Sequence, residues 1–257
     1  WITGASSGIG KACAFRFAEE GAILILTALE TDLLENVKTI CLEKGASTLS
    51  LLPIDLSKTD FLHDLVIQAW NIYGKIDILF NNAGISQRGN TIDTTIDVIH
   101  KIMDVNFFAP VIISKAVLPM MLKQGNGHFV TTTSIAGKFG FPLRSAYCSS
   151  KHALYGFFET IQAEYYNENI RVTFVCPGRV RTNISFYALE KDGSPHGKLD
   201  DGQAQAISSE KAAKQIINAI YKQKREVLIG GKELSMTYIK RFFPGLSALL
   251  ARKIKTM

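Results

Sequence analysis

The chain has 257 residues, of which 47% are hydrophobic and 20% are charged, and its formal net charge at pH 7 is +6. This composition supplies enough apolar side chains for a buried core and excludes an intrinsically disordered chain. The lysines and arginines are spread along the sequence without a basic stripe interleaved with aromatic residues, so we expect no nucleic-acid partner.

The chain opens on the glycine-rich stretch WITGASSGIGK. A nucleoside-triphosphate loop is excluded, because Ala5 stands where its first glycine belongs and Ala12 stands where its Ser or Thr belongs. The spacing of Gly4, Gly8 and Gly10 suits a dinucleotide-binding turn from a strand to a helix, although it departs from the G-x-G-x-x-G form. A glycine-rich turn without a ligand is the alternative.

After this turn, short apolar runs alternate with long amphipathic stretches. The predicted strands are rich in Ile, Val, Leu and Thr and cover residues 22–28, 47–54, 75–81, 127–134, 170–177 and 225–230. A first helix is predicted from Ile9 to the break at Gly21, and further helices cover 32–44, 60–73, 96–123, 145–167 and 209–222. This order predicts a single α/β domain over 1–257, a doubly wound Rossmann-type sheet of about seven parallel strands with helices on both faces.

Two segments depart from this alternation. Residues 179–208 show no clear period and follow a strand end, which predicts a substrate lid, with a structureless insertion as the alternative. The tail, 235–257, is apolar and basic together. We expect a terminal helix packed on the core near the substrate entrance, and peripheral contact of the tail with a membrane surface is the alternative.

The cysteines, the histidines and the apolar runs limit which metal sites and cellular compartments are compatible with the sequence. The four cysteines, Cys13, Cys41, Cys148 and Cys176, show neither disulfide nor metal spacing, and the five histidines are scattered, so we expect a reduced protein without a metal site. No apolar run reaches the roughly 18 residues of a membrane span and no secretory signal is visible. These observations predict a cytoplasmic protein without a transmembrane segment.

A tyrosine is a poor acid or base unless a nearby cation lowers its pKa, and Tyr-x-x-x-Lys on a helix places an ammonium beside the phenol. The sequence contains this pattern twice, at Tyr147–Lys151 and at Tyr187–Lys191. Tyr147 begins a long predicted helix and follows a strand that ends at Ser134, whereas Tyr187 lies in the irregular segment. We therefore assign the chemistry to the first pair.

The chain resembles the short-chain dehydrogenase/reductase family along nearly its full length. The resemblance is carried by TGASSGIG (3–10), NNAG (81–84), Asn106 in DVN, the spacing of Ser134, Tyr147 and Lys151, and PGRVRT (177–182). Within the family, SIAGKFGFPLRSAY and SKHALYGFF are most similar to the reductases grouped with the 7B and 11β-hydroxysteroid types.

The resemblance implies a role for each matching residue. Tyr147 is the acid in reduction and the base in oxidation, Lys151 lowers its pKa and holds the nicotinamide ribose, and Ser134 binds the substrate carbonyl. Asn106 completes the catalytic set by holding a water that passes protons. The implied cofactor contacts are Thr3, Gly4, Ser6, Ser7, Gly8, Ile9, Gly10, Thr27, Asp55, Leu56, Asn82, Ala83, Gly84, Tyr147, Lys151, Pro177, Gly178, Val180 and Thr182.

Three of these roles have structural alternatives. Asn106 could bridge backbone groups, Asp55 could be a cap before the next helix, and Thr182 could be a residue of the loop surface. The choice between NAD(H) and NADP(H) is also open, because Ala28 and Leu29 stand where the family carries its acidic or basic determinants. Thr27 could bond a phosphate oxygen, and we favour NADP(H).

The sequence thus predicts an NAD(P)-dependent oxidoreductase that interconverts a carbonyl and an alcohol on a small to medium, lipophilic molecule. A catalytically silent NAD(P)-binding sensor or scaffold is the alternative. The resemblance further implies a homodimer or homotetramer built on the helices around 96–123 and 145–167.

Overall fold

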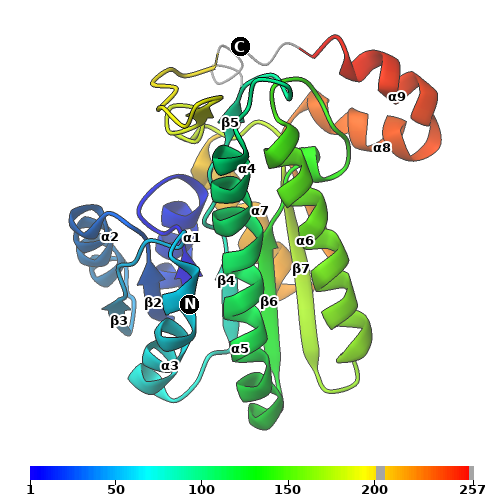
Figure 1. The fold of residues 1–257 in the computed structure, drawn as a ribbon. Helices are drawn as coiled ribbons and strands as arrows, with labels where there is room; N and C mark the ends of the chain where they lie inside the picture. The colour runs from blue at the N-terminus through cyan, green and yellow to red at the C-terminus, as the bar shows by residue number, and fades with distance from the viewer. Residues whose placement is uncertain (201–205, 255–257) are drawn as a thin grey trace.

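A computed structural model describes residues 1–200 and 206–254, and Figure 1 shows its fold. Seven parallel strands form one sheet in the order β3-β2-β1-β4-β6-β7-β9. The strands are β1 (Ile2–Thr3), β2 (Ile23–Thr27), β3 (Thr48–Leu51), β4 (Ile78–Asn81), β6 (Gly127–Thr132), β7 (Ile170–Pro177) and β9 (Glu226–Ile229). The doubly wound sheet predicted from the sequence is confirmed.

Helices cover both faces of the sheet because its strands are apolar on both sides. One face packs against α1 (Gly8–Glu19), α2 (Thr31–Glu43) and α7 (Ser209–Tyr221), and the other against α3 (Leu62–Tyr73), α5 (Ala109–Gln124) and α6 (Ser145–Glu164). The strand order changes direction between β1 and β4. In open α/β sheets this switch point, at the carboxyl ends of the strands, is where ligands bind.

The long helix predicted over 96–123 differs from the observed one. It consists of α4 (Ile96–Met103), a π-helical turn (Asp104–Phe108) and α5. A π-helical turn inserts one extra residue per turn and is frequent at functional sites. It has no sequence signature like that of glycine or proline, and periodicity alone therefore does not reveal it.

The predicted lid contains regular structure. A second, two-stranded parallel sheet pairs β5 (Gln87–Arg88) with β8 (Leu189–Glu190), and a single bridge joins Val180 to Ile207. The lid residues 201–205 lie outside the described part of the chain. In Figure 1 the lid lies at the same end of the main sheet as the two last helices.

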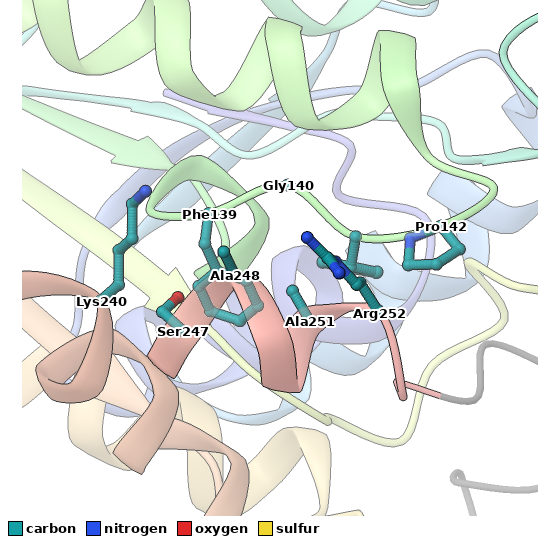
Figure 2. A pocket seen from close by; sticks show the side chains of 9 residues that line it. Phe139, Gly140, Pro142, Lys240, Ser247, Ala248, Ala251 and Arg252 are labelled. Atoms are coloured by element: carbon teal, nitrogen blue, oxygen red, sulfur yellow. The ribbon is translucent and has the colours of Figure 1, made fainter. Parts of the chain in front are cut away.

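The tail contacts the core on one side and is exposed on the other. Helices α8 (Ser235–Phe242) and α9 (Pro244–Ala251) lie over the loop 139–142, with a cavity of about 420 Å³ between loop and tail. Figure 2 shows Ser247, Ala248 and Ala251 of α9 facing this loop. The outer side exposes large apolar side chains, Tyr238, Phe242, Phe243, Leu246 and Leu249. The predicted packing of the tail near the cavity is thus observed, and contact of the exposed side with a membrane stays a prediction.

The expectation that no segment is apolar and long enough to span a membrane is wrong. The continuous helical segment Ile96–Gln124 has 29 residues, and its most apolar window has a mean hydropathy of 1.7. By length and composition alone it meets the requirement for a span, and 44% of that window is buried inside the protein. The buried part includes Ile113, Val117 and Met121, which pack in the core against the sheet.

Two glycine substitutions test the packing of the first turn. A Cβ at Gly10 would lie 2.2 Å from the carbonyl oxygen of Gly4, so Gly10→Ala forces backbone to move and should lower the free energy of unfolding by about 1–3 kcal/mol. Gly156, exposed in α6, has no atom within 4 Å of such a Cβ. Gly156→Ala should raise stability by about 0.5–1 kcal/mol. Urea unfolding of both variants measures this, and equal effects would contradict the packing argument.

Candidate active site

The candidate site is built first from a close backbone contact at the switch point. The turn after β1 carries Gly4 and Gly8 at positive φ, +65° and +53°. A Cβ at Gly4 would lie 2.7 Å from the Cα of Ala83, in the segment after β4. Only glycine permits this approach, so the turn and the 82–84 segment meet because of their residue types.

Asn82 connects the ends of three strands. Its Nδ2 donates to the carbonyl oxygens of Thr3 (3.1 Å) and Gly4 (3.2 Å), and its Oδ1 accepts from the hydroxyl of Thr132 (3.2 Å). The hydroxyl of Thr3 in turn accepts the N–H groups of Asn82 and Ala83, at 3.1 and 3.2 Å. These bonds hold β1, β4 and β6 together at their carboxyl ends and give the site a rigid floor.

Ser134 and Tyr147 line one cavity of about 340 Å³. Ser134 follows β6, where its hydroxyl accepts the N–H of Ala136 (3.1 Å) and donates to the carbonyl of Pro177 (3.2 Å). Tyr147 lies in the first turn of α6, and Lys151 lies one turn later with its Nζ 5.9 Å from the centre of the tyrosine ring. The three residues of the predicted catalytic set are thus brought together.

Burial has the largest effect on the pKa values of two residues on α6, Tyr147 and Lys151. It raises the pKa of Tyr147 above its ordinary value, while the neighbouring Ser134 hydroxyl and the charge of Arg144 act in the opposite direction. Burial lowers the pKa of Lys151 to about 8. The expected lowering of the tyrosine pKa by Lys151 is therefore not found; Lys151 donates instead to the carbonyl of Thr132 at 2.9 Å.

Asn106 lies in the π-helical turn, fully buried. Its Oδ1 accepts the N–H of Ile85 (2.8 Å), and its Nδ2 donates to the carbonyl of Ile85 (2.9 Å) and to the hydroxyl of Ser150 (3.1 Å). The side chain bridges two segments, as the alternative from the sequence foresaw. It also borders the cofactor floor, because a Cβ at Gly84 would lie 3.1 Å from Asn106 Oδ1 and 3.3 Å from Lys151 Nζ.

The other predicted cofactor contacts occupy different places around the turn. Thr182 covers it, since its Cγ2 lies 3.0 Å from a Cβ built on Gly8. Asp55 accepts the N–H of Ser57 (2.9 Å) in a local turn, and the N-cap of the following helical turn is Lys58 rather than Asp55. Ser7 is the N-cap residue of α1 without a side-chain cap bond. The remaining side chains that pack in the core are those of Ile9, Leu56 and Val180.

The proposed phosphate contact of Thr27 is wrong. Thr27 is fully buried, and its hydroxyl accepts the indole N–H of Trp1 at 2.9 Å. The side chain that reaches the edge of the turn is Glu30, whose carboxylate accepts the hydroxyl of Ser6 at 3.0 Å. The argument for NADP(H) from Thr27 therefore loses its basis.

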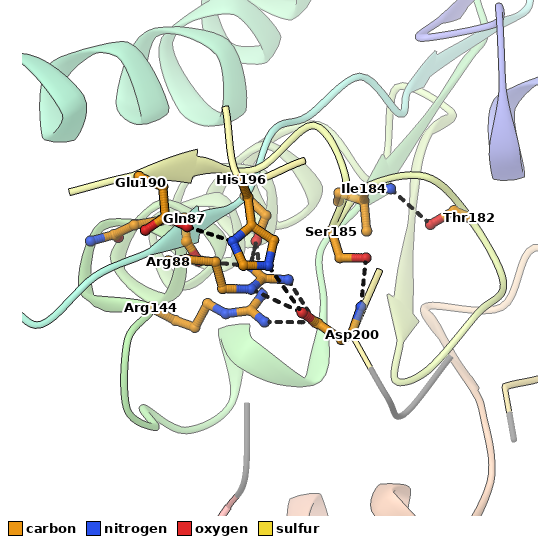
Figure 3. Close-up of polar contacts among 10 residues, drawn as sticks. Gln87, Arg88, Arg144, Thr182, Ile184, Ser185, Glu190, His196 and Asp200 are labelled. Atoms are coloured by element: carbon orange, nitrogen blue, oxygen red, sulfur yellow. Dashed lines mark hydrogen bonds and ion pairs between the residues drawn. The ribbon is translucent and has the colours of Figure 1, made fainter. Parts of the chain in front are cut away.

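Three charged residues of the cavity were missed from the sequence. Arg88, Arg144 and Asp200 come from β5, from the residue before α6 and from the lid, and they form one ionic cluster, shown in Figure 3. Their spacing in the sequence follows no motif. The arginine directly before the predicted helix of Tyr147 was the one signal available.

The chain matches known proteins in sequence and in fold. A family model described as "short chain dehydrogenase" matches residues 1–192. The mouse protein "Dehydrogenase/reductase SDR family member 7B" is 39% identical over 252 residues, which are 95% of this chain and 77% of that protein.

Solved structures share the fold. A short-chain dehydrogenase/reductase from Burkholderia phymatum in complex with NAD superposes with a TM-score of 0.83 at 22% identity, over all of this chain and 96% of that one. A short-chain dehydrogenase from Sphingobium yanoikuyae in complex with NADPH gives a TM-score of 0.79 at 23% identity, over 99% of this chain and 95% of that one.

The prediction of a cytoplasmic protein is wrong. It depends on the absence of a membrane-length apolar segment, and Ile96–Gln124 is such a segment by length and composition. The mouse relative also contains residues beyond the match, since this chain covers 77% of its length. No compartment is therefore assigned to this chain.

Substituting Thr27 tests its structural role. Thr27→Val removes the acceptor of the Trp1 indole and should lower the free energy of unfolding by about 1–3 kcal/mol, with no change in the ratio of the NADPH and NADH dissociation constants. Thr39→Val, which alters an exposed threonine of α2, is the matched control and should change stability by less than about 0.5 kcal/mol. A selective loss of NADPH binding by Thr27→Val would restore the phosphate contact.

Proposed function

The chain belongs to the short-chain dehydrogenase/reductase family, and on that premise we propose that it interconverts a carbonyl and an alcohol with Tyr147 as the acid and base. The members of this family are NAD(P)-dependent oxidoreductases, and this chain is therefore an NAD(P)-dependent oxidoreductase. The observation that carries the proposal is the convergence of Ser134 and Tyr147 on one cavity, with Lys151 one helical turn behind.

The residues around the glycine turn fit a nicotinamide dinucleotide. The absence of a Cβ at Gly4 and Gly10 lets the turn pack closely on the Asn82–Gly84 segment, and the start of α1 then offers backbone N–H groups of the kind that bind a pyrophosphate. When bound, the nicotinamide supplies or accepts the hydride. Thr182 lies over the turn and is positioned to contact the cofactor from above.

The protein's part of the reaction is to position the carbonyl and to move one proton. In reduction Ser134 donates a hydrogen bond to the carbonyl oxygen and Tyr147 transfers its proton to it; in oxidation the phenolate accepts the proton of the alcohol. Because burial raises the pKa of Tyr147, the phenol is protonated at neutral pH in the structure described here. This protonation state suits the reductive direction.

The choice between NAD(H) and NADP(H) depends on the side chains at the edge of the glycine turn. The family resemblance favours NADP(H), but Thr27 is no longer a candidate to bind its 2′-phosphate. The carboxylate of Glu30, bonded to Ser6 of the turn, would repel a 2′-phosphate and accept a free 2′-hydroxyl. We therefore propose that Glu30 shifts the preference toward NAD(H).

The lid and the long helices complete the proposal. The lid supplies Ile184 to the wall of the cavity, and Phe139 and Phe141 form its apolar part, which supports a substrate with a lipophilic portion.

A homodimer or homotetramer on α5 and α6 would also cover Phe108, which is 44% exposed at the start of α5. Size-exclusion chromatography with light scattering measures this association.

A catalytically silent NAD(P)-binding sensor is the competing function. Such a protein has no need of a buried tyrosine beside a serine hydroxyl in a cavity open to a small molecule. Turnover of any carbonyl compound that depends on Tyr147 excludes it.

The role of Tyr147 is tested by removing its hydroxyl. Tyr147→Phe should lower turnover by about 10²–10⁴-fold, because the acid is lost, while the dissociation constant of the cofactor changes little. The tyrosine of the other Tyr-x-x-x-Lys pattern provides the control: Tyr187 is 56% exposed, and Tyr187→Phe should keep turnover within about twofold. Unchanged turnover of Tyr147→Phe would remove the assignment.

The role of Glu30 is tested by neutralising it. Glu30→Gln should tighten NADPH binding relative to NADH by about fivefold, the effect of removing roughly 1 kcal/mol of repulsion at an exposed site. Glu35→Gln, which neutralises an exposed glutamate elsewhere on α2, should leave the ratio unchanged. Titration of nicotinamide fluorescence measures both, and an unchanged ratio for Glu30→Gln would contradict the proposal.

A further inference from the structure

The cavity that holds Ser134 and Tyr147 contains an excess of buried positive charge. Arg88 and Arg144 both bond to one carboxylate, that of Asp200, as Figure 3 shows. The side chain of Arg88 is 2% exposed and that of Arg144 is 11% exposed. Buried charges are normally paired, so the balance of this cluster determines what else the cavity can accept.

Arg88 is fully paired. Its Nε and Nη2 donate to the two oxygens of Asp200, at 3.2 and 2.6 Å, in the fork geometry that arginine forms with a carboxylate. Its Nη1 donates to the hydroxyl of Ser86 (3.1 Å) and to the carbonyl of Gln87 (2.7 Å). The single negative charge of Asp200 is therefore already matched.

Arg144 shares the carboxylate of Asp200 with Arg88. Its Nη2 donates to the same oxygen of Asp200 at 3.2 Å, and its Nη1 donates to Ser86 at 2.8 Å. Among residues 1–200 and 206–254, its Nε has no hydrogen-bond partner. Burial and the charge of Arg88 lower the pKa of Arg144 to about 10. Among the residues that the structure describes, the guanidinium of Arg144 therefore shares its counter-charge, Asp200, with Arg88.

Arg179 also lines the cavity but is exposed to solvent, and the two other carboxylates near the cluster are engaged elsewhere. Glu233 accepts the backbone N–H groups of Arg179 (2.8 Å) and Gly231 (3.0 Å) at the far wall of the cavity. Glu190 does not line the cavity, is 38% exposed, and is paired with His196. Neither carboxylate is bonded to Arg144.

We propose that the substrate carries a carboxylate that binds Arg144, in addition to the carbonyl held by Ser134 and Tyr147. A planar guanidinium recognises a carboxylate through two parallel hydrogen bonds. Arg144 is the N-cap residue of the helix that carries Tyr147, and both side chains line the same cavity, so one substrate can contact both. This inference rests on the proposed function and narrows it to an oxo acid.

The remainder of the substrate is apolar. Phe139 and Phe141 line both the catalytic cavity and the adjoining cavity under α9. In Figure 2 this second cavity runs between the loop of Phe139 and the small side chains Ala248 and Ala251. An alkyl chain that leaves the carbonyl in this direction would contact Phe139 and Phe141. The predicted substrate class is therefore an oxo acid with an apolar chain.

A competing role for Arg144 is electrostatic support of Tyr147, whose pKa its charge lowers. The two roles differ in what they do to substrates. Support of Tyr147 acts on every carbonyl compound equally, whereas a carboxylate contact acts only on substrates that carry the anion. A matched pair of acid and ester separates them.

The test compares 4-oxodecanoate and 5-oxodecanoate with their methyl esters, using the full chain and its preferred cofactor. The wild-type protein should show a kcat/KM for at least one acid that exceeds that of its ester by about 30-fold, a ratio that falls as salt is raised. Arg144→Gln should abolish this preference, and Arg144→Lys should keep part of it. Arg225→Gln, which removes an exposed positive charge at the opposite end of the sheet, should leave the preference unchanged.

Three results would overturn the inference. The first is equal rates for acid and ester in the wild-type protein, which exclude a carboxylate site. This result needs no variant and so does not depend on whether a variant folds. The second is an equal loss on both compounds in Arg144→Gln, which assigns the charge to Tyr147. The third is Tyr147-dependent turnover of a neutral ketone with no turnover of either acid. Absence of turnover with every carbonyl compound is a different outcome, and it removes the proposed function itself.

Discussion

The close backbone contact between the glycine turn after β1 and the Asn82–Gly84 segment after β4 is the constraint on which the site depends. It requires glycine at residue 4, where a Cβ would lie 2.7 Å from Ala83, and it is held by the hydrogen bonds of Asn82 to Thr3 and Gly4. In the proposed function, a cofactor binds at this contact, between two strand ends. Every other functional group is positioned relative to that place.

Helix α6 brings the chemistry to this floor. It carries Tyr147 and Lys151 on one face, and two hydrogen bonds set its position: Ala146 donates its N–H to the side chain of Gln87 (2.9 Å), and Ser150 accepts from Asn106 (3.1 Å). Gln87 belongs to β5, which pairs with the lid strand β8. The lid, the catalytic helix and the π-helical turn therefore form one connected unit around the substrate.

Burial gives this unit its electrostatic character. The phenol, the ammonium and the two guanidiniums are all removed from water, so each interaction among them is stronger than at the surface. A buried phenol retains its proton, and a buried guanidinium that shares its counter-charge attracts an anion. The same exclusion of water thus supports the proposed class of substrate.

The sequence by itself determined the strand and helix alternation, the glycine turn and the Ser134–Tyr147–Lys151 set, because periodicity, glycine and fixed spacing along one helix are local signals. The tertiary structure alone decided the rest. It buried Thr27 against Trp1, inserted the π-helical turn at Asn106 and joined Arg88 to Asp200 across 112 residues. Such contacts depend on how distant segments pack, and packing between distant segments leaves no periodic pattern in a single sequence.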